Sequence, residues 1–209
     1  MQNKNPWQWV PSLYFAEGFP YVLVVTISAI LFKQMGISNA DITLYTGWLY
    51  LPWVIKPIWS PFIDLLQSKR WWVLITQSLL GIGLAAIAFS IPTSHFLQVS
   101  LAIFWLLAFS SATHDIAADG LYLLSLSQGD QSLFVGIRNT FYRIASIVGQ
   151  GGILFVVGIL ERRGITTMKA WSIAFIAAAL IMIFLSLYHL RSLPKSTNDS
   201  TTSSGKESA

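Results

Sequence analysis

The chain has 209 residues, of which 54% are hydrophobic and only 11% are charged, and its mean hydropathy is +0.60. Soluble domains carry about 25% charged residues, so this composition excludes an ordinary soluble domain and predicts a polytopic membrane protein. The absence of cysteine excludes disulfides, thiolate metal sites and a cysteine nucleophile. The net charge of +4 includes no run of basic residues, which argues against binding to nucleic acid.

Six stretches of the sequence are long and apolar enough to be transmembrane helices. A helix that crosses the hydrocarbon core of a bilayer needs about 20 mostly apolar residues. The apolar runs are continuous, which excludes the alternating pattern of a transmembrane β-barrel. The sequence therefore predicts an all-α bundle of six transmembrane helices within residues 1–193, at about 10–32, 42–63, 71–91, 98–124, 134–160 and 170–190.

The composition changes at the end of the sixth stretch. Residues 194–209 are rich in Ser, Thr and Lys and contain no large apolar side chain. Such a segment cannot bury enough apolar surface to fold by itself. We predict that it is a disordered cytoplasmic tail, or a linker to a further helical half.

Lysine and arginine in the short flanks predict the orientation, because cytoplasmic loops carry an excess of these residues. The first span is about 23 residues long and holds Glu17 and Pro20, so we expect it to be retained and not cleaved as a signal peptide. With the N-terminus inside, the inner flanks hold six basic residues and the outer flanks hold four. We therefore predict a multi-pass protein of the inner cell membrane with both termini in the cytoplasm. The six inner residues are Lys4, Lys69, Arg70, Arg191, Lys195 and Lys206, and the four outer ones are Lys33, Arg162, Arg163 and Lys169.

Ionisable side chains at membrane depth cost roughly 2.5–3.5 kcal/mol each on insertion scales, so they are usually paired or functional. Consecutive spans form hairpins, in which residues equidistant from the connecting loop lie at similar depth. By this measure Glu17 and Lys56 should lie at similar depth on neighbouring helices. Three acids and three bases fall within the predicted spans, namely Glu17, Lys56, Asp115, Asp119, Arg138 and Arg143.

The fourth and fifth spans are predicted to share two acid–base pairs. Asp119 and Arg138 are equidistant from the connection at 125–132, and so are Asp115 and Arg143. The two aspartates are four residues apart and share one helix face. The two arginines are five residues apart and diverge by about 140° around the helix, which leaves a water-bridged contact open for one of the two pairs.

The distribution of charge among the spans suggests an internal repeat. Spans three and six carry no acidic or basic side chain, whereas the other four spans do. A period of three helices is expected of two inverted three-helix repeats, here about 10–91 and 98–190. In this interpretation the charged helices face a polar cavity and the neutral helices face lipid. The alternative is that the charges only fix helix packing.

Other polar side chains lie near the charges of spans four and five. Asn139 and Tyr142 lie between the two arginines around the helix, and Gln150 lies on the same charged side, so all three are candidate ligand contacts. His114 adjoins Asp115 but is displaced by about 100° around the helix. A proton relay and a packing or hydrogen-bonding role both remain open for this histidine.

Motifs typical of enzymes are absent from the sequence. It contains no HExxH, no GxSxG and no glycine-rich phosphate loop followed by lysine. The three histidines lie in different parts of the chain, so a histidine metal cluster is not expected. We therefore expect no enzymatic activity, no cofactor and no metal site.

Residues 110–120 read SSATHDIAADG, in which small residues precede two aspartates spaced four apart. This run resembles the fourth helix of the muropeptide permease branch of the major facilitator superfamily, and the acetyl-CoA transporters of that branch carry a similar run. His114 stands where the branch usually has glutamine. Residues 14–20 (YFAEGFP) and 136–144 (GIRNTFYRI) are similar to the first and fifth helices of the branch.

The loop between helices two and three of this superfamily is usually G-x-x-x-D-R-x-G-R-R/K. Here the aspartate is present as Asp64, and the closing basic pair is present as Lys69 and Arg70. The first glycine and the internal Arg and Gly are replaced. The resemblance therefore identifies these three residues as what remains of the cytoplasmic loop motif.

The resemblance implies a secondary transporter of which this chain is the N-terminal six-helix half. It implies proton-driven uptake of a polar or anionic solute such as a muropeptide-like sugar–peptide, with the solute, protons, the lipid bilayer and a second six-helix half as partners. A non-transporting membrane scaffold or receptor is the alternative, and the missing motifs disfavour an intramembrane enzyme. The candidate coupling residues are Glu17, Asp115 and Asp119, and the candidate solute or gate contacts are Lys56, Arg138, Arg143, Asn139, Tyr142 and Gln150.

Overall fold

The computed structural model describes residues 4–195, apart from the side chain of residue 64. Within this range the chain is helical and contains no β-strand, which confirms the predicted all-α class. The predicted tail lies outside the described residues from position 196 onward. Five helical stretches in the described range are long and apolar enough to cross a membrane, namely Pro6–Gln34, Lys69–Ser90, Phe96–Ser125, Gln128–Arg162 and Thr167–Ser192.

The first stretch contains a π-helical turn after an internal proline. Pro20 lies inside α1 without ending the helix. Because proline has no N–H, it removes one helical hydrogen bond, and the wider π-helical turn follows directly. The parts of this stretch are η1 (Pro6–Gln8), α1 (Val10–Val22), η2 (Leu23–Ile27) and α2 (Ser28–Gln34).

The fourth stretch also changes to a π-helical turn, at a run of glycines. The turn includes Gly149, Gly151 and Gly152, and glycine disfavours a regular helix interior because it loses the most conformational freedom. The stretch consists of α8 (Gln128–Ile147), η5 (Val148–Gly152) and α9 (Ile153–Arg162). Of the five candidate spans it is the least buried.

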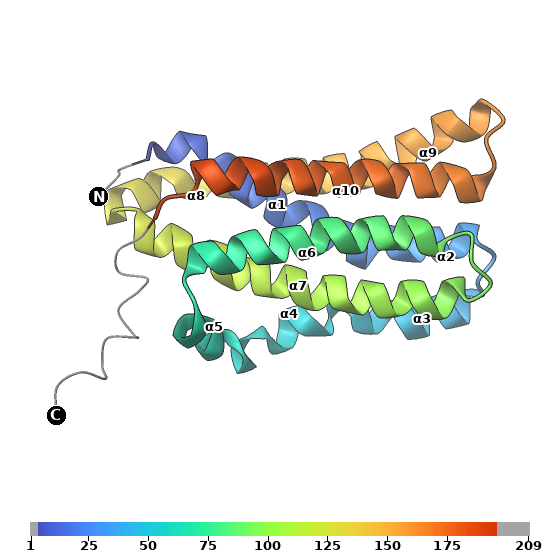
Figure 1. Cartoon of the computed structure of the whole chain (residues 1–209), viewed down its shortest axis with the longest axis horizontal. Helices are drawn as coiled ribbons and strands as arrows, with labels where there is room; N and C mark the ends of the chain where they lie inside the picture. Colours follow the sequence, from blue (N-terminus) through green and yellow to red (C-terminus); the bar gives the residue numbers. More distant parts are fainter. Residues whose placement is uncertain (1–3, 196–209) are drawn as a thin grey trace.

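The expected second span, 42–63, is not one continuous helix. Pro52, Pro57 and Pro61 each lie in the first turn of a short helix, where the missing N–H is tolerated. The short helices nevertheless follow one another along α7 (Figure 1). They are α3 (Asn39–Thr46), η3 (Gly47–Tyr50), α4 (Leu51–Ile55), η4 (Lys56–Ile58) and α5 (Ser60–Leu66).

The bundle is held together by three extensive helix contacts. α6 (Lys69–Ser90) packs against both α7 (Phe96–Ser125) and α10 (Thr167–Ser192), and α1 packs against α8. The main core is apolar and includes fully buried aromatic side chains such as Phe104, Trp171 and Phe175. α6 and α10, which carry no charge in their central turns, also expose large apolar side chains, which is the pattern expected for contact with lipid.

α1 approaches α8 and η5 closely because glycines lie at these contacts. A Cβ on Gly18 would lie 2.6 Å from the backbone oxygen of Tyr142, and a Cβ on Gly149 would collide with the side chain of Val22. Small residues of this kind let two helix backbones pack together in membranes. This contact determines how the charges of α8 meet those of α1 and α7.

Both ends of the described chain lie at one end of the bundle (Figure 1). The connections at 67–68 and 126–127 lie at this same end, and those at 35–38, 91–95 and 163–166 lie at the opposite end. The long helices therefore run alternately up and down. This arrangement is the one required by the hairpin argument for matching residues by depth.

Candidate functional site

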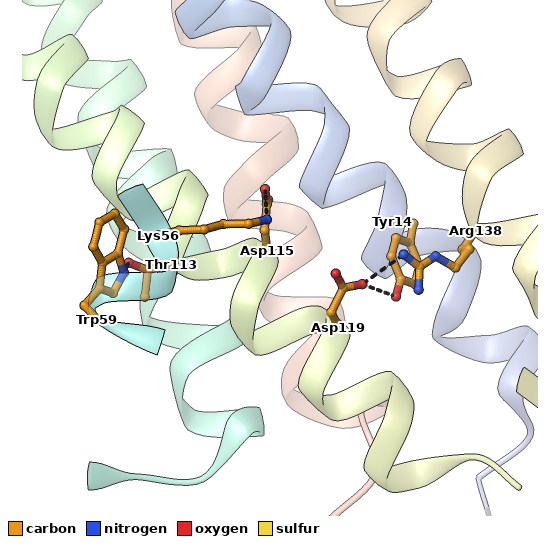
Figure 2. A network of polar contacts seen from close by, with 7 residues as sticks. All are labelled: Tyr14, Lys56, Trp59, Thr113, Asp115, Asp119 and Arg138. Carbon is orange, nitrogen blue, oxygen red and sulfur yellow. Dashed lines mark hydrogen bonds and ion pairs between the residues drawn. The ribbon is translucent and has the colours of Figure 1, made fainter. Parts of the chain in front are cut away.

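Two ion pairs lie one helical turn apart along α7 (Figure 2). Asp115 Oδ2 lies 3.8 Å from Lys56 Nζ, and Asp119 Oδ1 lies 3.2 Å from Arg138 Nη2. The aspartates are four residues apart and therefore occupy one face of α7. Their partners come from opposite sides, Lys56 from the proline-interrupted segment and Arg138 from α8.

The Asp119–Arg138 pair is the one that the hairpin argument predicts, and α1 adds a third member to it. The Tyr14 hydroxyl donates a hydrogen bond of 2.8 Å to the same carboxylate oxygen of Asp119. The guanidinium carbon of Arg138 lies 4.7 Å from the centre of the Tyr14 ring and 5.2 Å from that of Tyr122. Cation–π contacts of this kind hold a guanidinium in place, so Arg138 is fixed between α1, α7 and α8.

Sequence reasoning missed both tyrosines of this cluster. Tyr14 lies one turn before Glu17, and Tyr122 lies one turn after Asp119, so each shares a face with a charged residue. Their rings pack edge to face, with centres 5.8 Å apart. Helical spacing from the charged residues was a signal that could have identified them as partners.

The predicted pair between Asp115 and Arg143 is wrong, because Lys56 is the partner of Asp115. The prolines break the segment around Lys56 into short helices that pack on α7, which brings the lysine to the aspartate. Arg143 is exposed on α8 and forms no ion pair within the described part of the chain. Its divergence of about 140° from Arg138 turns it away from α7.

Glu17 is buried on α1, and members of both ion pairs act on it electrostatically. Its residue is 8% exposed, and its Oε2 atom has no hydrogen-bond partner among the described residues. Lys56 lies among its electrostatic neighbours, but no ion pair joins the two side chains in the described range. The charged groups that act most strongly on the Glu17 carboxyl are Asp115, Asp119, Arg138 and Lys56.

A cavity of about 410 Å³ lies beside the Lys56–Asp115 pair. Next to it, Trp59 donates an indole hydrogen bond of 3.3 Å to the Thr113 hydroxyl, which ties the interrupted segment to α7 (Figure 2). The Lys56 side chain is 35% exposed and contributes to the lining of the cavity. The cavity is lined by Lys56, Pro57, Ser60, Pro61 and Ile116.

The other candidate solute contacts of the fifth span take no part in the two ion pairs. Asn139 and Gln150 are exposed, as Arg143 is, whereas Tyr142 is half-buried. The Tyr142 ring lies 6.2 Å from that of Tyr21 on α1. The three exposed polar side chains therefore share the surface of α8 and η5 with exposed apolar ones such as Ile144 and Ile147.

The loop-motif residues lie at the end of the bundle that holds both described chain ends. Lys69 is buried, and its side chain lies against Gly120 of α7. Arg70 donates a hydrogen bond to the backbone oxygen of Leu190 on α10. The side chain of Asp64 lies outside the described part of the structure. The basic pair thus contacts two different helices.

The acidic and basic side chains of this cluster lie close enough together for their pairing to depend on which of them are charged. Carboxylates and bases alternate within this cluster, and Oε2 of Glu17 and Oδ1 of Asp115 have no hydrogen-bond partner in the described part of the chain. Uptake of a proton or binding of a charged solute at such groups would change which pairs form. Within residues 4–195 no group of three or more His, Cys, Asp or Glu side chains is placed to hold a metal ion.

Comparison with known proteins identifies the family. A family model described as the BT1 family matches residues 17–132, which is more than half of the chain. The chain is 28% identical over 188 residues to a candidate transporter of Rickettsia conorii named AmpG 4, covering 84% of this chain and 42% of that protein. It is 31% identical over 147 residues to the anhydromuropeptide permease of Escherichia coli, covering 66% of this chain and 29% of that protein.

An uncharacterized protein of Haemophilus influenzae is 29% identical over 182 residues, which cover 83% of this chain and 40% of that protein. The chain thus spans less than half the length of these curated relatives. The relatives include permeases and transporters, as the resemblance of the first, fourth and fifth spans to muropeptide permeases predicts. This polytopic membrane protein belongs to the BT1 family.

Proposed function

We propose that this chain forms one half of a secondary transporter that imports a polar or anionic solute of the sugar–peptide class. Its family and its similarity to an anhydromuropeptide permease support the proposal. The observation that carries it is the charged and partly unpaired cluster at membrane depth, with an accessible cavity beside Lys56. Lipid-facing helices do not carry such a cluster without a polar environment.

The exposed charge on α8 supports a second half. Arg143 lies near the middle of the stretch Gln128–Arg162, so we expect it at mid-depth in a bilayer. An uncompensated arginine there costs roughly 2.5–3.5 kcal/mol or more. A second six-helix bundle packed on this face would remove the arginine from lipid and would close a cavity between the halves, as alternating access requires.

Within such a transporter we assign coupling to a buried acid and solute contact to accessible bases and amides, and we assign one of the two ion pairs a separate role. Glu17 is the first choice for proton uptake because its carboxyl group is buried and its Oε2 atom has no hydrogen-bond partner among the described residues. Lys56 and Arg143 are the first choices for contact with an anionic solute because both remain accessible. The Asp119–Arg138 ion pair would hold α7 and α8 together near one end of the bundle, and the two helices would separate there when the pair is broken.

A chimera with a relative tests this proposal. Residues 1–193 would replace the matching part of the Escherichia coli anhydromuropeptide permease, and uptake of a labelled anhydromuropeptide would be measured in vesicles with an imposed proton gradient. We expect uptake above that of empty vesicles, and we expect collapse of the gradient to abolish it. The substitution Glu17→Gln in the chimera should abolish uptake that depends on the gradient but leave binding of the solute.

The chain alone provides the matched negative control. Reconstituted at a high lipid-to-protein ratio, where monomers dominate, it should show no uptake, because it supplies only one wall of the cavity. A chimera that folds and reaches the membrane but transports nothing would contradict the proposal. Uptake by demonstrated monomers of the chain would contradict the need for a second half.

A further inference from the structure

A chain of hydrogen bonds separate from the two ion pairs runs through the interface of α1, α10, α6 and α7. Ser12 Oγ lies 2.9 Å from His189 Nε2, and His189 Nδ1 lies 2.9 Å from Gln77 Oε1. Gln77 Nε2 in turn lies 2.9 Å from His114 Nε2. Gln77, His114 and His189 are fully buried. We call these four residues the Gln77 chain.

The amide of Gln77 imposes a rule on the two imidazoles that it joins. An amide oxygen can only accept a hydrogen bond, and an amide nitrogen can only donate one. One histidine must therefore donate to Gln77 while the other accepts from it. An imidazolium donates from both ring nitrogens, so His114 and His189 cannot both be protonated while both bonds to Gln77 are kept.

The same rule fixes the tautomers of the neutral state. Either orientation of the Gln77 amide fits the same atomic positions, because its oxygen and nitrogen are nearly alike in size. With Oε1 toward His114, both histidines carry their proton on Nε2. With Oε1 toward His189, both carry it on Nδ1. In either orientation the two histidines share one tautomer.

The ends of the chain favour the first of these two orientations. His114 Nδ1 is buried and has no partner in the described part of the chain, and Ser12 Oγ also lies 3.2 Å from the backbone oxygen of Trp9. If His189 carries its proton on Nε2, it donates to Ser12, and the Ser12 hydroxyl can still donate to Trp9. If His189 carries it on Nδ1, Ser12 must donate to His189 and loses the bond to Trp9. The first orientation therefore makes one more hydrogen bond.

We propose that the Gln77 chain is a binding site for one proton that His114 and His189 share, and that Gln77 makes protonation of one imidazole exclude protonation of the other. A proton taken up by His114 turns Oε1 of Gln77 toward His114 and holds His189 neutral. A proton taken up by His189 turns the amide around and holds His114 neutral. Rotation of one amide thus transmits the protonation state of α7 to α10.

The charged side chains near His114 and His189 do not replace the hydrogen-bonded connection through Gln77 in the described part of the chain. Asp115 follows His114 in the sequence, but its carboxylate is directed toward Lys56 (Figure 2). None of the charged side chains hydrogen bonds to either imidazole in the described part of the chain, which leaves Gln77 as the connection. The charged residues within eight sequence positions of the Gln77 chain are Lys4 before α1, Glu17 on α1, Lys69 and Arg70 on α6, Asp115 and Asp119 on α7, Arg191 on α10 and Lys195 after it.

Solid-state ¹⁵N NMR of the full chain in lipid bilayers tests this proposal, with the histidines labelled and His95→Gln as background to remove the exposed third histidine. We expect both buried imidazoles to be neutral near pH 7 and to share the Nε2-protonated tautomer. On acidification, one imidazole should become doubly protonated while the other stays neutral for as long as the helical fold persists. Opposite tautomers, or protonation of both imidazoles in one step, would overturn the proposal.

In the variant Gln77→Glu we expect the two histidines to adopt different tautomers. A carboxylate accepts from both sides, so His114 should carry its proton on Nε2 and His189 on Nδ1, and the two should no longer exclude each other. Ser78→Ala is the matched control, because it removes the neighbouring bond to Ser186 (3.0 Å) and leaves the Gln77 chain intact. A shared tautomer in a folded Gln77→Glu variant would contradict the role of the amide. If that variant does not fold, the parent spectra decide alone.

Discussion

The ammonium group of Lys56 lies 3.8 Å from the carboxylate of Asp115 and joins the proline-interrupted segment to α7. Asp115 is nearly buried, whereas the Lys56 side chain is 35% exposed beside the cavity. The lysine therefore compensates the charge of a buried carboxylate while its own side chain remains partly exposed, and Oδ1 of Asp115 has no hydrogen-bond partner among the described residues. This pair is the contact at which binding of an anion would compete directly with an internal charge.

Replacing Lys56 by methionine should destabilise the bundle by about 1–2 kcal/mol. Removal of one partner from a fully buried pair costs about 3–5 kcal/mol, and the partial exposure of Lys56 reduces this cost because water screens the pair. Arg163→Met, at the exposed connection after α9, is the control and should change stability by less than about 0.5 kcal/mol. Unfolding in detergent followed by circular dichroism would measure both. An equal loss in the two variants would refute the Lys56–Asp115 pair.

Exchanging the charges of Asp119 and Arg138 should recover part of the stability lost in either single alanine variant. Each single change leaves one charge without its partner, whereas the double variant Asp119→Arg with Arg138→Asp restores an ion pair. Recovery should be incomplete, because the Tyr14 hydroxyl can then only accept a hydrogen bond from the new guanidinium and the contact of Arg138 with the Tyr14 ring is lost. Expression level and thermal midpoint are the measurements. Single variants as stable as the parent would show that the pair contributes nothing.

Two substitutions at Tyr14 separate its hydroxyl from its ring. Tyr14→Phe removes the hydrogen bond to Asp119 and should cost about 1–2 kcal/mol, as expected for a bond to a charged acceptor that is partly exposed. Tyr14→Leu also removes the ring beneath Arg138 and should cost about 1 kcal/mol more. Equal losses in thermal unfolding would mean that the ring contributes no cation–π stabilisation.

Gly18→Ala should weaken the contact between α1 and α8. The added methyl group would lie 2.6 Å from a backbone oxygen of Tyr142, which cannot rotate away, so the helices must separate at a cost of about 1–3 kcal/mol. Gly136→Ala is the matched control, because nothing lies within 4 Å of its added methyl group. Alanine there should stabilise the helix by up to about 1 kcal/mol. A Gly18→Ala variant that unfolds at or above the parent temperature would contradict this packing.

Reporter fusions test the orientation of the bundle. Fusions after Ser94 and after Gly164 should report an external location, and a fusion after Gly205 should report the cytoplasm. The connections at 91–95 and 163–166 lie at one end of the bundle and residue 195 lies at the other, so the first two fusions must agree with each other and differ from the third (Figure 1). An external signal at Gly205 would contradict the predicted topology.

The fold class and one ion pair could be predicted from the sequence because both depend on local patterns. Long apolar runs determine helices that cross a membrane, and five of the six predicted spans are continuous helical stretches in the structure. Asp119 and Arg138 face each other because one short connection fixes the relative depth of α7 and α8. Such a match needs no knowledge of how the other helices pack.

Contacts between distant segments depended on the tertiary structure. The sequence shows that Asp115 needs a base, but only the packing of the interrupted segment on α7 decides that Lys56 supplies it and that Arg143 does not. Tyr14 and Asp119 are 105 residues apart, and Gln77 and His189 are 112 apart. Helical periodicity assigns each such side chain to a face of its own helix. Which faces meet is decided by the packing of whole helices, and here glycines at the α1–α8 contact and prolines in the second span set that packing.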